Sequence, residues 1–153
     1  VDVSNGLPRF DLVGLADTAV KEAKERVCSA IKNSGRSVPA KKIIANFAPA
    51  DVKKEGSSFD LPLAIAVLKA TGQLVCDTDD AVFIGELSLD GSLRRVNGVL
   101  PSVISARSYG KKKFIVPAGN AKEASFVEGA VVYGASSLKE VIDHLSGLNP
   151  IAP

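Results

Sequence analysis

Residues 60–71 constrain the fold of this chain more than any other segment. After Asp60 they are almost entirely apolar and leave Lys69 as the one charge. The apolar positions include Leu61, Ala64, Ile65, Val67 and Leu68. Pro62 suits the first turn of a helix, where backbone N–H groups have no intrahelical partner. Because a helix that is apolar almost all round is a buried helix, we expect residues 60–71 to lie inside the protein.

The composition is that of one ordered domain. With 153 residues, 46% of them apolar, the chain is long enough to bury a core and too apolar to be disordered. Aromatic residues make up only 5%, so stacking platforms for single-stranded nucleic acid are few. The net charge of +2 only weakly favours an anionic partner. No apolar run is long enough to span a membrane, and we expect a cytoplasmic protein without a membrane partner.

Hydrophobic periodicity and turn signals predict an α+β fold. Residues 1–13 should form a hairpin around Asn5-Gly6, and residues 81–93 a second hairpin around Asp90-Gly91. Further strands are expected at 42–47, 114–116 and 130–133. Helices are expected at 17–33, 60–71, 98–108 and 121–127, and from the capping box at 137–140 to about Gly147. Since helix 121–127 connects strands 114–116 and 130–133, these two strands should be parallel.

Cys28, Cys76 and His144 are too few and too scattered for an ordinary zinc site, and we predict no metal site. The two cysteines lie among apolar residues and favour buried free thiols, with a disulfide or a reactive thiol as the alternative. His144 falls on the last predicted helix and favours a structural or solvated role. No Gly-x-x-x-x-Gly-Lys-Ser/Thr motif occurs, so these residues contain no P-loop.

Ser57 and Ser58 stand directly before the predicted buried helix and allow three interpretations. They can cap the free N–H groups of the helix, or they can bind an anion at its positive end. One of them can also be a nucleophile, which needs a base to take its proton. With His144 set aside, that base must be a lysine whose pKa is lowered by desolvation.

The stretch 55–60, Glu-Gly-Ser-Ser-Phe-Asp, resembles the Asp-Gly-Pro-Ser-Ala-Gly motif around the nucleophile of Lon proteases. Ser58 matches the nucleophile, and Ser57 replaces the proline. The stretch 84–93, Ile-Gly-Glu-Leu-Ser-Leu-Asp-Gly-Ser-Leu, is similar to a further Lon segment, and residues 114–117 with Asn120 to another. The resemblance implies a Lon-protease-like fold, also seen in the second domain of ribosomal protein S5, with a mixed sheet packed by helices.

The same resemblance argues against catalysis. Lon proteases carry Gly-Gly-Leu-Lys, whose lysine is the base, where residues 97–100 read Asn-Gly-Val-Leu. Leu100 cannot accept a proton, so Ser58 and Leu100 make a degenerate site and we predict no catalytic residue. Lys53 and Lys54 lie near Ser58 in sequence, but solvated lysines stay charged and are unfit as bases.

A closer resemblance, to the magnesium-chelatase-like AAA+ ATPases of the YifB/ComM type, covers essentially the whole chain. It is carried by segments in order and at family spacing: Gly6-Leu7-Pro8, Val13-Gly14-Leu15, 18–22, Arg26-Val27, 30–35, 46–51, Lys54-Glu55-Gly56, 59–62, Gly85-Glu86-Leu87, 98–101, Val116-Pro117 and Ser136-Ser137-Leu138. The resemblance implies a non-catalytic accessory domain at residues 1–148, with the family's first strand missing.

In that family an AAA+ module follows this domain. The resemblance therefore implies that residues 149–153 begin a linker, and that ATP and magnesium are bound by the absent module rather than by these residues. It further implies a homo-hexamer in the full-length protein that acts in DNA processing during natural transformation. The accessory domain would assist ring assembly, or engage DNA or a partner.

Basic residues form four candidate clusters for DNA or partner contact. They are Lys41-Lys42, Lys53-Lys54, Arg94-Arg95 and Lys111, Lys112 and Lys113. Phosphate binding needs only clustered Lys and Arg, whereas a solvated surface explains the same residues without a ligand. No base-reading motif is present, so any DNA binding should be independent of sequence. Two alternatives to the accessory domain remain, a cryptic hydrolase that uses Ser58 and a free-standing nucleic-acid-binding module.

Overall fold

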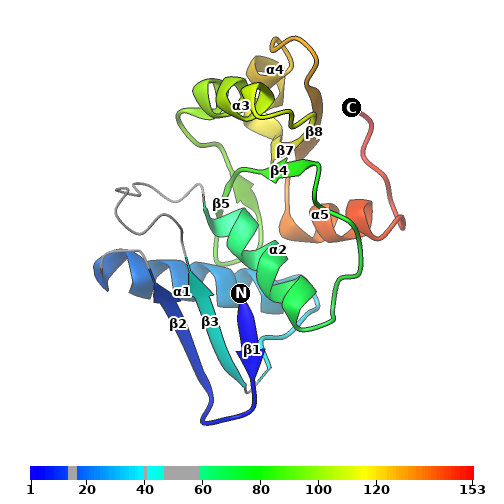
Figure 1. Cartoon of the computed structure of the whole chain (residues 1–153). Helices are drawn as coiled ribbons and strands as arrows, with labels where there is room; N and C mark the ends of the chain where they lie inside the picture. Colours follow the sequence, from blue (N-terminus) through cyan, green and yellow to red (C-terminus); the bar gives the residue numbers. More distant parts are fainter. Residues whose placement is uncertain (14–16, 40, 47–58) are drawn as a thin grey trace.

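The computed structural model describes residues 1–13, 17–39, 41–46 and 59–153 (Figure 1). Over these residues it is an α+β structure, in which helices pack on small sheets. The elements in chain order are β1 (Asp2–Ser4), β2 (Arg9–Val13), α1 (Asp17–Asn33), β3 (Lys42–Asn46), α2 (Asp60–Ala70), β4 (Ala81–Phe83), β5 (Glu86–Leu87), β6 (Leu93–Arg94), α3 (Val99–Ser108), β7 (Lys113–Pro117), α4 (Ala118–Ala124), β8 (Val131–Ala135) and α5 (Leu138–Leu145).

The first sheet has the strand order β1-β3-β2, with β1 antiparallel and β2 parallel to β3. The predicted hairpin of residues 1–13 is therefore wrong, because β3 lies between the two strands. Val3 and Phe10 both stand opposite Ile43, which is almost fully buried. The more apolar β3 takes the central position, where both of its edges are paired, and the short, largely exposed β1 takes an edge. The mixed pairing itself agrees with the predicted mixed sheet.

The second sheet is fully parallel and has the order β4-β7-β8. The prediction that β7 and β8 are parallel is thus confirmed, with α4 as their connection. Alternation along β7 divides its side chains between two faces, since Ile115 belongs to one apolar cluster while Phe114 and Val116 belong to another.

The predicted hairpin of residues 81–93 is only partly right. β5 and β6 pair antiparallel around Asp90-Gly91, but residues 81–83 form β4 and pair with β7 instead. The single strand predicted for 81–87 is interrupted at Gly85. A Cβ on Gly85 would lie 2.7 Å from Leu93 Cδ2, and its carbonyl accepts a hydrogen bond from Leu61 N–H at 3.0 Å. Close packing against α2 and β6 therefore ends the strand there.

The helices follow the predicted segments closely. α1 buries the face that its periodicity indicates, including Val27, Ala30 and Ile31. α2 is buried from its first turn, as predicted, and contacts α1, β4 and β5. Figure 1 shows α2 between the two larger sheets. α4 covers 118–124 rather than the predicted 121–127, because its first turn follows directly from β7.

Two apolar clusters lie on opposite sides of the second sheet. The main cluster is built around α2 and includes buried residues of α1, β2, β3 and α5. The smaller cluster joins the second sheet to α3 and α4 through Ile84, Val96, Val99, Val103, Phe114, Val116, Ala124 and Val132. The β5–β6 hairpin and the residues after it connect the two clusters, since Leu87 belongs to the first and Val96 to the second.

Among the helices of the described residues, none has the length and apolar character needed to cross a membrane.

Candidate functional site

The two halves of the degenerate Lon-like site are not equally visible. Ser57 and Ser58, together with Lys53 and Lys54, lie outside the described residues, so their three interpretations stay predictions. Leu100 lies in the first turn of α3 and is 37% exposed. It follows Gly98, whose left-handed backbone (φ 78°) precedes the helix. The position that the Lon resemblance gives to a lysine is thus a half-open surface position held by an aliphatic side chain.

Asp60 is the charged group that the described residues place closest in sequence to Ser58, and it is only 2% exposed. It lies in the first turn of α2, where the helix dipole favours a negative charge. Its carboxylate accepts two hydrogen bonds from Arg26 of α1, from Nε at 2.6 Å and from Nη2 at 3.1 Å. It also accepts one from the backbone N–H of Leu87 at 3.1 Å. One carboxylate therefore ties α1, the start of α2 and β5 together.

Burial and pairing shift the pKa values of Asp60 and Arg26 for different reasons. Burial raises the pKa of Asp60, although hydrogen bonds from Arg26 and from Leu87 N–H pull it down. The hydrogen bond to Asp60 raises the pKa of Arg26, which keeps the guanidinium charged. The Arg26 side chain is 21% exposed and also lies 3.9 Å from Glu22, its i,i+4 neighbour on α1. Among the described residues, this geometry fixes the helix start and engages the Asp60 carboxylate in three structural hydrogen bonds.

Asn120 is the second buried polar residue near the Lon-like segments, and it is fully buried in α4. Its Oδ1 accepts from Val96 N–H at 3.0 Å, and its Nδ2 donates to Val96 C=O at 2.9 Å. Nδ2 also donates to Glu123 Oε1 at 2.7 Å. The amide thus mimics a strand partner for Val96 and holds the chain just before α3 and Leu100.

The structure does not gather the basic clusters into one surface. Lys41 and Lys42 lie at the start of β3 in the first sheet. Lys113 begins β7, whereas Arg95 packs beside Gly119, just beyond the other end of that strand. The described clusters therefore lie at three separate places (Figure 1).

The basic clusters also differ in the acidic and carbonyl groups that lie near their side chains. Lys113 Nζ lies 3.4 Å from Asp80 Oδ2, and Lys111 donates to the carbonyl of Asp79. Arg94 and Arg95 are exposed, and neither forms an ion pair within 4 Å with another residue of the described chain. Arg94 stands opposite Glu86 across the β5–β6 pair, so Arg94-Arg95 is an exposed cluster with acidic neighbours but no close ion pair among the described residues.

Cys28 and Cys76 are both free and half-buried, so the disulfide alternative is wrong and the expected full burial is only partial. Burial raises the pKa of the Cys28 thiol, which disfavours the reactive thiolate. His144 lies on α5 as predicted, with its ring 4.6 Å from that of Tyr133. No group of three or more His, Cys, Asp or Glu side chains able to hold a metal ion occurs within the part of the chain that the structure describes.

Sequence reasoning did not single out Arg26 and Asp60. The available signal was an acidic residue at the first turn of an otherwise apolar helix, because a charge that is carried into a core needs a partner. Asn120 was noted only through the Lon resemblance. Its role as the partner of Val96 depends on a contact across 24 positions in sequence.

Comparison with known proteins places these features in context. The family model described as subunit ChlI of Mg-chelatase matches residues 1–120. Competence protein ComM of Haemophilus influenzae is 45% identical over 148 residues, and the protein YifB of Escherichia coli is 46% identical over 148 residues. Each match covers 96% of this chain and 29% of the relative, so the chain spans less than a third of these proteins. Lon protease 2 of Bacillus subtilis is 26% identical over 126 residues, covering 82% of this chain and 22% of that protein.

Proposed function

This chain belongs to the family described as subunit ChlI of Mg-chelatase, and from that premise we propose that it is a non-catalytic accessory domain of a larger AAA+ ATPase. Its fold would be that of the Lon-like, ribosomal-S5-domain-2 type. Residues 1–148 would form the domain and residues 149–153 the start of its linker. Its task would be to assist ring assembly, or to engage DNA or a partner, while a separate module hydrolyses ATP.

The observation that carries this proposal is a match along nearly the whole chain combined with an absent base. The similarity to ComM and YifB runs over 148 residues, whereas that to Lon protease 2 is weaker. At the position of the Lon lysine stands Leu100, whose side chain has no group that accepts a proton. A scaffold related to a protease but lacking its base is suited to binding rather than to cleavage.

The residues of this chain are poorly suited to binding magnesium or ATP. The described side chains include no cluster able to hold a metal ion, and the sequence has no P-loop motif. We therefore place both in the proposed AAA+ module. A homo-hexamer and a role in DNA processing are likewise proposals for the full-length protein, supported by its similarity to a protein named for competence.

Arg94 and Arg95 are the residues that we propose for DNA contact. They are exposed and form no ion pair within 4 Å among the described residues, and they directly precede the segment that Asn120 holds in place. Such a pair can neutralise phosphates without reading bases. Each phosphate contact that is lost should lower the slope of log affinity against log salt by about 0.9 for duplex DNA.

The test compares the full-length protein with a variant that carries Arg94→Glu and Arg95→Glu. If these arginines contact DNA, the variant should bind an arbitrary duplex several-fold more weakly at low salt and show a shallower salt dependence. Lys41→Glu with Lys42→Glu is the matched control, because it makes the same charge change in the first sheet, away from the β5–β6 pair. An equal loss in both variants would favour a general field effect, and no loss in either would remove DNA contact from the proposal.

Removal of residues 1–148 from the full-length protein tests the accessory role itself. The shortened protein should keep measurable ATP hydrolysis and lose hexamer stability or DNA-stimulated turnover. Hydrolysis of ATP by the isolated domain alone would contradict the assignment of roles.

A further inference from the structure

The chain turns sharply after α5 and leaves the end of that helix toward the second sheet (Figure 1). Gly147 adopts the left-handed conformation (φ 76°), and Leu148 N–H and Asn149 N–H both donate to the carbonyl of Asp143. This arrangement is a glycine-terminated helix end. After this turn Ile151 lies beside His144, a side chain seven positions earlier in the sequence.

Ile151 is fastened to the domain by one hydrogen bond and by apolar packing. Its backbone N–H donates to His144 Nδ1 at 2.9 Å. Its side chain is half-buried and packs against the main apolar cluster, as do Tyr133 and Leu145. The flanking Pro150 and Ala152 are exposed. Residues 149–153 are thus a short strap with a single buried anchor.

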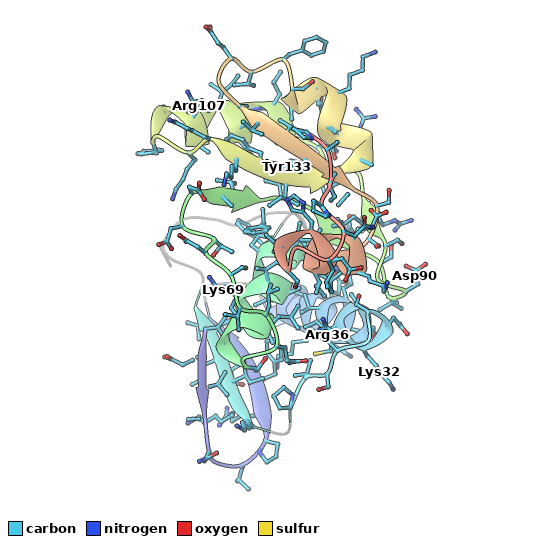
Figure 2. The ribbon with its side chains drawn as sticks, turned by 90° about the vertical axis from the view of Figure 1, so that its right-hand side faces the viewer. Lys32, Arg36, Lys69, Asp90, Arg107 and Tyr133 are labelled. Carbon is cyan, nitrogen blue, oxygen red and sulfur yellow. The ribbon has the colours of Figure 1, made fainter. Side chains whose placement is uncertain are left out.

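The imidazole of His144 is held in a defined orientation. Its ring lies 4.6 Å from the ring of Tyr133 on β8, which Figure 2 labels on the strand facing α5. An imidazole nitrogen that accepts a hydrogen bond carries no proton, so Nδ1 is the acceptor and Nε2 carries the N–H of the neutral ring. After protonation both nitrogens are donors, and Nδ1–H would then face the N–H of Ile151.

We propose that residues 149–153 form an acid-releasable strap, closed when His144 accepts a hydrogen bond from Ile151 N–H and opened when the imidazole is protonated. Under the proposed function, on which this consequence rests, the strap would fix the direction of the linker toward the AAA+ module. Protonation of His144 removes the hydrogen bond that holds Ile151 among the described residues, and the Ile151 N–H must then bond to water.

The charged neighbours of His144 set where this change occurs. Burial, and after it the positive charge of Lys113 on β7, lower the pKa of His144. Lys113 itself faces Asp80, and on α5 the adjacent Asp143 is occupied by Lys139 at 3.4 Å. Since the folded pKa lies below the ordinary value, the strap is complete above the ordinary histidine pKa and is lost as the pH falls through the lowered one.

The test uses the fact that the sequence contains only one histidine. The imidazole proton signals of the chain report its titration directly, and the heteronuclear NOE of the Ile151 amide reports the mobility of the strap. At pH 7.5 the NOE of Ile151 should equal that of Val141 in α5. It should fall to the level of a free terminus over the same pH interval in which the imidazole titrates.

Two variants distinguish the effect of the hydrogen bond to Ile151 from the effect of the ring contact with Tyr133. His144→Asn keeps an acceptor oxygen near the position of Nδ1 and does not titrate, so Ile151 should stay ordered at low pH. His144→Phe keeps the ring on Tyr133 and has no acceptor, so Ile151 should be mobile at every pH. A strap that is mobile at pH 7.5 in the wild type, or that stays ordered after the imidazole has titrated, would overturn the proposal. The wild-type titration decides this even if a variant fails to fold.

Discussion

Asp60 and Asn120 hold the same stretch of chain from opposite ends by different means. Asp60 binds the N–H of Leu87 in β5 and is itself bound by Arg26, while Asn120 binds both backbone groups of Val96. The first is a charged hub in the main apolar cluster, and the second is a neutral hub beside the smaller cluster. The comparison teaches that two of the buried polar residues position the segment before Leu100, Asp60 through an ion pair and Asn120 through its amide.

The difference between the two hubs should appear first in stability. Asp60→Ala removes the buried partner of the Arg26 guanidinium, which keeps only the exposed Glu22 at 3.9 Å, and leaves the N–H of Leu87 without its acceptor. Breaking a buried ion pair costs about 3–5 kcal/mol, and because Arg26 is partly exposed we expect about 3 kcal/mol. Urea denaturation measures this loss, with the exposed Asp79→Ala as control, which should change the free energy of unfolding by less than about 0.5 kcal/mol. Equal effects of the two variants would show that Asp60 does not act as a hub.

Asn120→Ala should cost less, about 2 kcal/mol. It removes no charge, but it leaves the buried N–H and C=O of Val96 unsatisfied, at about 1–3 kcal/mol for an unpaired group. The same denaturation experiment measures it. Because the two hubs share no partner, the losses in a double variant with Asp60→Ala should add to within about 0.5 kcal/mol. A strongly non-additive result would mean that the segment between Leu87 and Val96 couples them.

Close packing between β8 and α4 should have the next largest effect on stability. A Cβ on Gly134 would lie 2.9 Å from Ala121 Cβ and 3.3 Å from Ala118 Cα, so β8 and α4 touch there. Gly134→Ala should therefore cost about 1–2 kcal/mol, in the range of overpacked substitutions. Thermal unfolding measures it, and Gly6→Ala is the control, because the nearest atoms to a Cβ there lie at 3.8 Å. Equal shifts in melting temperature would argue against tight contact between β8 and α4.

The smallest expected difference between the hubs is their response to pH. Since burial raises the pKa of Asp60, the folded protein binds a proton there at higher pH than the unfolded chain does. The stability of the wild type relative to Asp60→Asn should thus fall as the pH rises from the ordinary aspartate pKa through the raised one. The stability of the wild type relative to Asn120→Ala should not change over this pH range. A relative stability that rises with pH would mean that pairing with Arg26 outweighs burial.

The fold could be predicted from the sequence wherever local patterns decide the structure. The apolar run of α2, the striped face of α1 and the capping box of α5 each predicted their helix. At α5 the Ser137 hydroxyl accepts from Glu140 N–H at 3.1 Å, while the Glu140 carboxylate reaches the N–H of Ser136 at 2.5 Å. These contacts span at most four positions, so the local sequence pattern is enough to predict them.

Long-range pairing could not be predicted in the same way. The hairpin signal at Asn5-Gly6 is local, but β3, about thirty residues later, offers both neighbours a more buried partner. The strand break at Gly85 likewise depends on Leu61 and Leu93, which no local pattern brings together. The candidate site shows the same limit, since Arg26 and Asp60 meet across 34 positions in sequence.

The account depends most on the absence of a proton acceptor at the Lon-like site, and one labelling experiment tests it directly. The isolated domain is incubated with a serine-acylating probe of the fluorophosphonate class, alongside Ser58→Ala. A serine without a base is a weak nucleophile, so we expect no labelling of the wild type above the level of the variant. Stoichiometric labelling that disappears in Ser58→Ala would contradict the account and establish a hydrolase.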